Sequence, residues 1–189
     1  ASLVIQHEAT GGTLARSIKD LDRGRVAALD VPVGAVGGQM MSLNYIENVH
    51  LRSEWDEPSI HACIVCASAS CPDLRREAYD ADRLEDQIRS QMEAWMANPT
   101  KGLRLEEGNR VRISRVYLWF QDDWGSAEAV RQFIAHYDLP QGAREALESN
   151  ITALRYFKYD WTINRMRSKA QEEAMRAVRR NMKSAKPKK

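Results

Sequence analysis

The sequence has little of what would mark a membrane protein or a disulfide-rich scaffold. No apolar run approaches the roughly 20 residues of a membrane-spanning helix, and no secretory signal is visible. Three cysteines in 189 residues are too few, and odd in number, for a fully paired disulfide framework. The composition, 43% hydrophobic and 29% charged, is typical of one soluble domain with a substantial core. The chain opens on Ala1 and not on Met, which fits either a processed end, as after entry to an organelle, or a boundary within a longer sequence. A soluble or peripheral protein is expected, and its compartment is not assigned.

Charge is distributed unevenly along the chain. Residues 165–189 hold ten Lys or Arg and two Glu, a balance of +8, whereas residues 1–164 hold 18 basic and 24 acidic residues, a balance of −6. Apolar residues recur every four positions in the basic segment (Met166, Ala170, Ala174, Val178 and Met182), which predicts a helix with one narrow apolar stripe. We therefore expect a globular domain over residues 1–164 and a basic helical tail over residues 165–189.

Turn and periodicity signals predict an α+β fold with a small mixed sheet and surrounding helices. The Gly37-Gly38 pair indicates a turn between two short strands. Ser42 is a suitable N-cap for a helix over residues 42–52, and the strongest helical stripe lies in residues 80–99. Further helices are expected after Ser126 and after Pro140. Because strands and helices do not alternate as regular βαβ units, the pattern favours α+β over α/β.

Three other segments are predicted to be extended. Residues 60–68, IHACIVCAS, form a nearly all-apolar run rich in β-branched residues, typical of a strand buried on both faces. Residues 109–120, NRVRISRVYLWF, change the parity of their apolar positions near Ser114, which indicates a strand with a bulge. The aromatic-rich segment 155–164, RYFKYDWTIN, is the third.

All three cysteines lie together in residues 59–75, SIHACIVCASASCPDLR. A zinc site would need His61 and all three thiols, but on a strand Cys63 and Cys66 point to opposite faces. We therefore predict no metal site, and no other cofactor. A disulfide between Cys66 and Cys71 stays open, because only the small residues Ala-Ser-Ala-Ser separate them.

A catalytic thiolate and simple packing are the remaining interpretations. Cys71 precedes Pro72, where the start of a helix would lower the pKa of a thiol, and His50 or His61 would supply an imidazole. Buried cysteines also pack as small apolar groups. Packing is the preferred interpretation for Cys63, whereas for Cys66 and Cys71 both interpretations stay open.

Five segments of the chain share their order and their polar residues with one known family. They are SLNYIENVHLR, PSIHACIVCASASCPDLR, LEDQI, ISRVYLWFQDDWG and YFKYDWTIN. From about Ser17 to Asn164 the chain resembles the domain of unknown function 547 family. The resemblance implies a compact α+β domain with shared polar positions at Glu47, Arg52, His61, Cys66, Cys71, Ser114, Asp123, Asp160 and Asn164.

The shared positions are rich in Cys, His and carboxylate residues, which suggests a cysteine hydrolase. The catalytic candidates are Cys66, Cys71, His61, Glu47 and Asp160. A structural ion pair with Arg52 or Arg115 is an equally good interpretation of the carboxylates, because an unpaired carboxylate is costly to bury.

Two departures from the family pattern count against catalysis. Family members usually carry His directly after the Ile-Glu pair, where this chain has Asn48, so His50 would have to replace that imidazole. The aromatic helix that usually precedes the region matching Leu3 to Glu8 is also missing from the sequence.

We therefore expect a non-catalytic binding or structural subunit that docks into a larger protein complex through its surface and its basic tail. The tail would contact an acidic surface through Arg165, Arg167, Lys169, Arg176, Arg179, Arg180 and Lys183. Nucleic acid is a less favoured partner, because the tail lacks aromatic residues for stacking. The alternative is a cysteine-dependent hydrolase or transferase of papain-like logic, with a thiol, a histidine base and a carboxylate.

The segment 156–164 is further expected to pack against residues 60–68. In that arrangement Asp160 would be buried against an Arg or backbone donors, and Asp160→Ala would cost roughly 3 kcal/mol or more.

Overall fold

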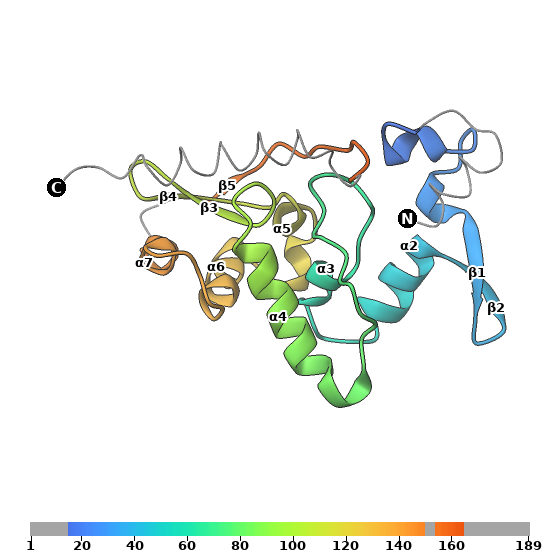
Figure 1. Cartoon of the computed structure of the whole chain (residues 1–189), viewed down its shortest axis with the longest axis horizontal. Helices are drawn as coiled ribbons and strands as arrows, with labels where there is room; N and C mark the ends of the chain where they lie inside the picture. The colour runs from blue at the N-terminus through green and yellow to red at the C-terminus, as the bar shows by residue number, and fades with distance from the viewer. Residues whose placement is uncertain (1–14, 150–153, 165–189) are drawn as a thin grey trace.

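The computed structural model describes residues 15–149 and 154–164, and in them it has the expected α+β architecture (Figure 1). The basic tail, including its seven binding candidates, and the division of the chain at residue 164/165 lie outside what the described residues can test. Among the described helices, none combines the length and apolarity needed to cross a membrane.

Within the described residues, five short strands form two sheets. The first is an antiparallel hairpin, and the second is mixed, with an antiparallel β3–β4 pair and a parallel β4–β5 pair. The strands are β1 (Pro32–Val36), β2 (Gln39–Ser42), β3 (Leu103–Glu106), β4 (Arg110–Ile113) and β5 (Arg155–Tyr156).

The helices are short apart from α4 and α6, and α3 to α7 lie below the three-stranded sheet in the view of Figure 1. They are α2 (Leu43–Tyr45), the π-helix η3 (Ile46–Leu51), α3 (Ile60–Cys63), α4 (Leu84–Met96), α5 (Val116–Trp119), α6 (Ala127–Ala135) and α7 (Ala143–Glu148), with 3-10 turns at η1 (Ile18–Leu21), η2 (Ala28–Asp30), η4 (Ala81–Arg83) and η5 (Gln121–Asp123).

Local sequence signals explain several of these boundaries. Gly37 and Gly38 both adopt positive φ, 57° and 82°, as the turn of a two-residue hairpin requires. The Ser42 hydroxyl accepts from the Tyr45 amide at 3.1 Å and so caps α2. In the same way the Ser126 hydroxyl accepts from the Ala129 amide and caps α6. The predicted turn at Gly37-Gly38, the cap at Ser42 and the helix after Ser126 are therefore confirmed. Each depends on three or four consecutive residues, so the sequence alone could indicate it.

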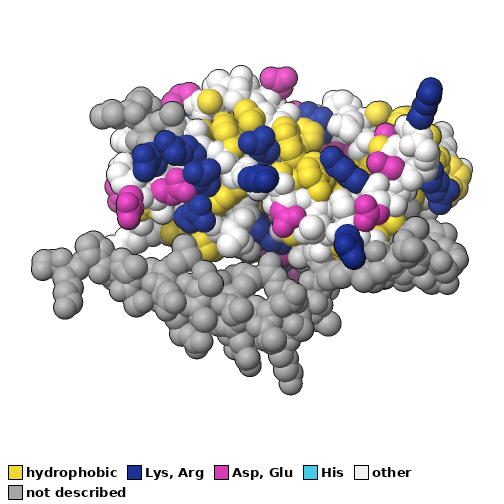
Figure 2. Space-filling model, turned by 90° about the horizontal axis from the view of Figure 1, so that it is seen from above, with side chains coloured by type: hydrophobic (Ala, Val, Ile, Leu, Met, Phe, Trp, Pro, Cys, Tyr) yellow, Lys and Arg dark blue, Asp and Glu magenta, His cyan; other side chains and the backbone are white. Residues whose placement is uncertain are grey.

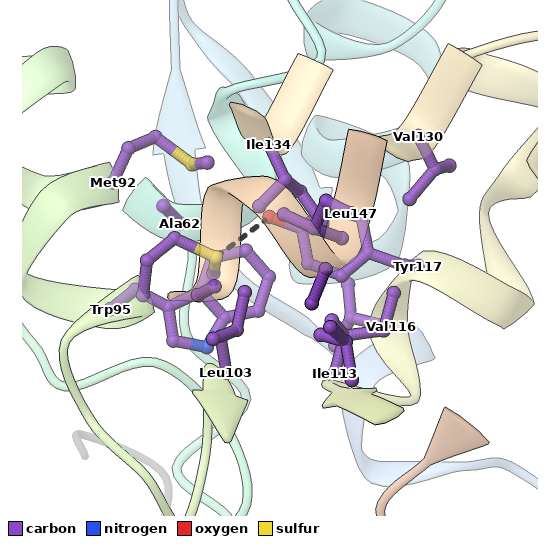
Figure 3. Close-up of a cluster of buried hydrophobic side chains, with 14 residues drawn as sticks. Ala62, Met92, Trp95, Leu103, Ile113, Val116, Tyr117, Val130, Ile134 and Leu147 are labelled. Carbon is purple, nitrogen blue, oxygen red and sulfur yellow. Dashed lines mark hydrogen bonds between the residues drawn. The ribbon is translucent and has the colours of Figure 1, made fainter. Parts of the chain in front are cut away.

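The main core lies between the three-stranded sheet and the helices (Figure 3). Helix α4 contributes Met92, Trp95 and Met96 from its predicted stripe, each at most 3% exposed. The Tyr117 hydroxyl donates to the Met96 sulfur at 3.6 Å, the dashed line in Figure 3. Close packing also explains Gly102, because a Cβ there would lie 1.8 Å from the Trp95 carbonyl oxygen.

A second, smaller core ties the two ends of the described chain together. Ala15, Ile18, Leu21 and Ala28 form it, and Trp161 and Ile163 pack against it. Because β5 pairs with β4 a few residues earlier, the segment 155–164 links the sheet to the N-terminal turns.

The outer surface is mixed in character. Figure 2 shows one face on which exposed hydrophobic side chains lie among Lys, Arg, Asp and Glu side chains. Part of the charge is paired on the three-stranded sheet, where Glu106 accepts from Arg104 at 3.0 Å and from Arg112 at 2.6 Å.

The strand predicted over residues 60–68 is wrong. Residues 60–63 form helix α3, and an extended segment follows from Ile64. The side chain of Gln91 in α4 donates to the Ala62 carbonyl at 3.1 Å, and Ala62 is fully buried. A short helix enclosed by other elements needs the same all-apolar sequence as a buried strand, so the pattern could not distinguish them.

The long strand predicted over residues 109–120 is also wrong in its second half. The strand ends at Ile113 and helix α5 begins at Val116. The Ser114 hydroxyl accepts from the Val116 amide at 3.3 Å. The parity change near Ser114 therefore marks the end of a strand and not a bulge within one.

Candidate functional site

A cavity of about 290 Å³ opens beside α3 and α5. Its walls come from η2, the α2–η3 helix, the segment after α3, α5 and residues 159–161, and they are mostly aliphatic and aromatic. Four of the five catalytic candidates line it: Glu47, His61, Cys66 and Cys71. Segments far apart in the sequence thus converge on one concave, largely apolar site, which is the usual setting of a ligand site.

The first polar group of the cavity is the thiol cluster, defined here as Cys66, Ser68, Cys71 and Tyr159. The Cys66 sulfur lies 3.2 Å from the Ser68 hydroxyl and 3.3 Å from the Tyr159 hydroxyl. The Ser68 and Tyr159 hydroxyl oxygens lie 2.8 Å from each other. The Cys66 amide donates to the Cys71 sulfur at 3.1 Å, so the two cysteines are in direct contact. Both are free thiols.

The hydrogen bonds of this cluster make the two thiols unequal. Hydrogen bonds from Cys71, and then from Ser68 and Tyr159, lower the pKa of Cys66 to about 5, although burial opposes the shift. The hydrogen bond to Cys66 and burial raise the pKa of Cys71. Cys66 is therefore the thiolate of the pair, and Cys71 is its proton-bearing neighbour.

Residues 66–71, here called the thiol loop, are anchored by backbone hydrogen bonds to segment 156–164. Ala67 adopts a positive φ of 63°, which turns the chain between Cys66 and Ser68. The Ala69 amide donates to the Thr162 carbonyl and the Asn164 amide donates to the Ala67 carbonyl, each at 2.7 Å. Segment 156–164 therefore packs against the thiol loop as predicted, and it brings Tyr159 to Cys66.

The second polar group is the ion-pair cluster, defined here as Arg52, His61 and Asp123. Arg52 binds both carboxylate oxygens of Asp123, from Nε at 2.7 Å and from a terminal nitrogen at 2.6 Å. The His61 Nε2 lies 2.7 Å from Asp123 Oδ2. The arginine hydrogen bond holds the pKa of Asp123 below its usual value. For Asp123 the structural ion-pair interpretation is thus the one that the structure supports.

His61 is only 3% exposed, and its ring stacks on Phe120 with centroids 4.4 Å apart. Burial lowers the pKa of His61 despite the neighbouring carboxylate. A neutral imidazole beside a carboxylate must carry its proton on the nitrogen that faces it. His61 therefore donates Nε2–H to Asp123 at neutral pH.

Glu47 stands between the two clusters. Burial raises its pKa, and the charge of Cys66 adds to that rise while Arg52 opposes it. The neighbouring Asn48 accepts from Arg52 at 2.6 Å and donates to the Asn44 carbonyl at 2.9 Å. His50 does not line the cavity, and its Nδ1 lies 3.1 Å from Glu54 instead. It therefore does not replace the imidazole that family members usually carry at the position of Asn48.

Asp160 lies outside the cavity, and the prediction that it is buried is wrong. Its side chain is exposed and accepts from the Thr162 amide at 3.0 Å and the Thr162 hydroxyl at 2.8 Å. This local turn satisfies the carboxylate without an arginine. The backbone of Asp160, not its side chain, contacts the thiol loop through Ser70.

Cys63 lies apart from the other two cysteines. Its sulfur donates to the Ser59 carbonyl at 3.6 Å, within α3, and burial raises its pKa.

Because residues 60–63 are helical, the argument from strand faces against zinc no longer applies. In the described part of the chain, no group of three or more His, Cys, Asp or Glu residues is arranged to hold a metal ion.

Sequence reasoning missed the hydroxyl partners of Cys66 and the aromatic side of the cavity. Tyr159 packs against both Trp119 and Trp161, with centroids 4.5 Å and 4.6 Å away, and all three line the cavity. Ser68 belonged to the quoted cysteine motif and could have been proposed from it. Tyr159 lies 93 residues from Cys66, and no spacing in the sequence links them.

Residues 4–96 match the model of the family described as "Protein of unknown function, DUF547". The chain therefore belongs to this family, as its motifs predicted. The match contains Glu47, His61, Cys66 and Cys71 but ends before Asp123 and Tyr159. No curated protein and no solved structure matches the chain.

Proposed function

We propose that the protein is a cysteine-dependent hydrolase or transferase of acyl groups, with Cys66 as the nucleophile. The observation that carries the proposal is the Cys66 sulfur in an apolar cavity, with hydrogen bonds from Cys71, Ser68 and Tyr159 that favour its thiolate. The thiolate is the form that attacks a carbonyl carbon. A pKa of about 5 leaves most Cys66 ionised at neutral pH.

In the proposed reaction the Cys66 sulfur attacks the carbonyl carbon of an ester or thioester. A carbon–sulfur bond to Cys66 forms, the bond between the carbonyl carbon and the leaving alkoxide or thiolate breaks, and the leaving group takes a proton. Glu47 is the carboxyl group in the cavity whose pKa is raised, so we assign it this proton. Water then attacks the acyl-cysteine and gives a proton to Glu47, and the carbon–sulfur bond breaks to release the acid and the Cys66 thiolate. An alcohol or thiol in place of water would complete a transfer.

This arrangement differs from a papain-like pair. Within residues 15–149 and 154–164, no imidazole is hydrogen-bonded to Cys66, and neutral donors supply its acidity instead. We assign His61 a positioning role, because Asp123 and Phe120 fix its ring in the cavity wall. The missing histidine at position 48 is therefore compatible with a reactive thiolate.

The cavity walls favour an uncharged, apolar acyl group. Leu43, Ile46, Ile64, Val65 and Phe120 line the cavity together with the three aromatic residues around Tyr159. A carboxylate or phosphate placed there would lose its hydration against apolar walls and lie near the Cys66 thiolate, both of which are unfavourable. A volume of about 290 Å³ is at the small end for ligand pockets and suits a short aliphatic or aromatic acyl group.

The test is acylation of Cys66 by p-nitrophenyl esters of increasing acyl length in the full chain. We expect a burst of p-nitrophenol and a matching mass increase on Cys66, both lost in Cys66→Ala. The matched control is Cys63→Ala, which should retain both signals. Equal acylation of Cys63 and Cys66 would contradict the proposal, as would a Cys66→Ala variant that hydrolyses the esters at the wild-type rate.

The second candidate is the non-catalytic subunit of a larger complex. The charge division along the sequence supports it: +8 in residues 165–189 against −6 elsewhere. Such a tail suits an acidic surface on a protein partner, to which Lys and Arg would bind through charge. This candidate predicts association that weakens as salt rises, because exposed charges are screened over about 10 Å at 0.1 M.

Deletion of residues 168–189 separates the two candidates. The subunit candidate expects the shortened domain to stay folded and to leave its complex. Retained association together with Cys66-dependent ester cleavage would favour the enzyme. Salt-sensitive binding of the tail to single-stranded nucleic acid, and not to protein, would contradict the protein-partner assignment.

A further inference from the structure

We propose that Cys66 and Cys71 form a redox-active pair, in which Cys66 reduces a hydroperoxide and Cys71 resolves the oxidised sulfur as an intramolecular disulfide. This activity uses the same thiol as acyl transfer but depends on none of its other steps. The observation behind it is the direct contact between the two residues in the absence of any cross-link.

The contact places the Cys71 sulfur beside Cys66. The Cys66 amide lies 3.1 Å from the Cys71 sulfur, and only four small residues separate the two cysteines. No bulky side chain of that loop would have to move for the sulfurs to bond, which matters because disulfide geometry is narrow. The backbone anchors at Ala67 and Ala69 hold the loop on both sides of Ser68.

Cys66 is more exposed to solvent than Cys71, and the reaction requires the attacking thiol to be the more accessible one. Cys66 is half-buried at the cavity wall, whereas Cys71 is only 5% exposed. Both residues line the cavity, but Cys66 is the more exposed of the two, so a small oxidant that enters the cavity reaches Cys66 more readily. The hydrogen bonds to Cys66 support this order, since susceptibility to oxidation follows thiolate character and exposure.

The chemistry balances with a hydroperoxide as the only co-reactant. The Cys66 thiolate attacks one peroxide oxygen, so that a sulfur–oxygen bond forms and the oxygen–oxygen bond breaks. The departing oxygen takes a proton from water and leaves as an alcohol or as water. The Cys71 sulfur then attacks the Cys66 sulfenic acid, and the hydroxyl leaves with the Cys71 proton as water.

The disulfide would also remove the nucleophile of the proposed acyl chemistry. Reduction by an external dithiol through thiol–disulfide exchange would restore both thiols. Cys63 takes no part, because its sulfur contacts Ser59 within α3 and does not line the cavity.

The experiment treats the reduced full chain with a slight excess of hydrogen peroxide and follows its mass and its cysteine-containing peptides. The wild type should lose the mass of two hydrogen atoms and yield a Cys66–Cys71 cross-linked peptide. Iodoacetamide labelling of Cys66 should fall by about tenfold or more and recover with dithiothreitol. Cys63→Ser is the matched control and should behave as the wild type does.

Cys71→Ser should stop at the sulfenic acid, which dimedone traps on Cys66, and then oxidise further to the sulfinic acid. Two results would overturn the proposal: a disulfide that contains Cys63, or wild-type Cys66 that reaches the sulfinic acid as fast as Cys71→Ser does. The wild-type peptide map remains decisive if a variant fails to fold. Loss of ester cleavage in the reduced protein would count only against acyl transfer, so the two proposals fail separately.

Discussion

The ion-pair cluster and the thiol cluster face the same cavity but are held by different forces. Arg52, His61 and Asp123 are joined by charge-assisted hydrogen bonds of 2.6–2.7 Å, the strong class of such interactions. Cys66 and its partners are joined by hydrogen bonds of 3.1–3.3 Å that involve sulfur and uncharged donors. The difference suggests a division of roles, in which the first cluster stabilises the site and the second sets the reactivity of the thiol.

The largest effect is expected from Asp123→Ala, which removes the acceptor shared by Arg52 and the buried His61. We expect a loss of about 3 kcal/mol in the free energy of unfolding, the low end for breaking a buried pair, because the Asp123 side chain keeps 20% of its exposure. Urea denaturation measures it. The control is the exposed Asp122→Ala, expected within about 0.5 kcal/mol. A loss of equal size in both variants would contradict the stabilising role of Asp123.

Tyr159→Phe tests the other cluster. Removing the hydroxyl deletes one hydrogen bond to the Cys66 thiolate, so the pKa of Cys66 should rise by about 1 unit, equivalent to about 1.4 kcal/mol. The pH dependence of iodoacetamide alkylation at Cys66 gives this pKa. Tyr156→Phe, on β5 and outside the cavity, is the matched control and should leave the pKa unchanged. A Cys66 pKa that does not move in Tyr159→Phe would show that Tyr159 is not a donor to the thiolate.

A smaller effect is expected in the free energy of unfolding as pH changes, because His61 titrates differently in the folded and unfolded chains. Its folded-state pKa lies below the ordinary 6.5, so between those two values the unfolded chain binds more protons than the folded one. Stability should therefore increase as pH rises through that window, up to about pH 6.5. The measurement is urea denaturation against pH, with His61→Gln as reference. A steeper rise in the variant than in the wild type would contradict the assignment of a neutral His61.

The smallest effect is expected from Asp160→Ala, which lies beside the thiol loop without contacting Cys66. Its exposed carboxylate makes only the local turn to Thr162, so the cost should be about 0.5–1 kcal/mol, comparable to loss of a cap. The pKa of Cys66 should not change. A loss near 3 kcal/mol in the free energy of unfolding, measured by heat or urea, would instead support the burial of Asp160 that was predicted from the sequence.

Comparison of the two clusters also indicates how far sequence reasoning can reach. Cys66, Cys71, His61 and Glu47 were identified from residue type and family motif, and the structure places all four around one cavity. Whether they are catalytic stays a prediction. Asp160 was identified by the same reasoning and lies outside the cavity, because a family motif does not show which way a side chain points.

Features that depend on a few consecutive residues could be predicted from the sequence alone. The Gly37-Gly38 turn, the caps at Ser42 and Ser126 and the buried stripe of α4 all follow from local backbone preference and helical periodicity. The sequence also determined the family, through the order of its motifs.

Which of these groups come into contact depends on the tertiary structure. Arg52 pairs with Asp123 across 71 residues, and Tyr159 reaches Cys66 across 93. The tertiary structure also decided that residues 60–63 are a helix, because packing against α4 selects between two conformations that the same apolar sequence allows. Hydrogen bonds and burial act through space, and so the acidity of Cys66 is a property of the folded chain and not of its motif.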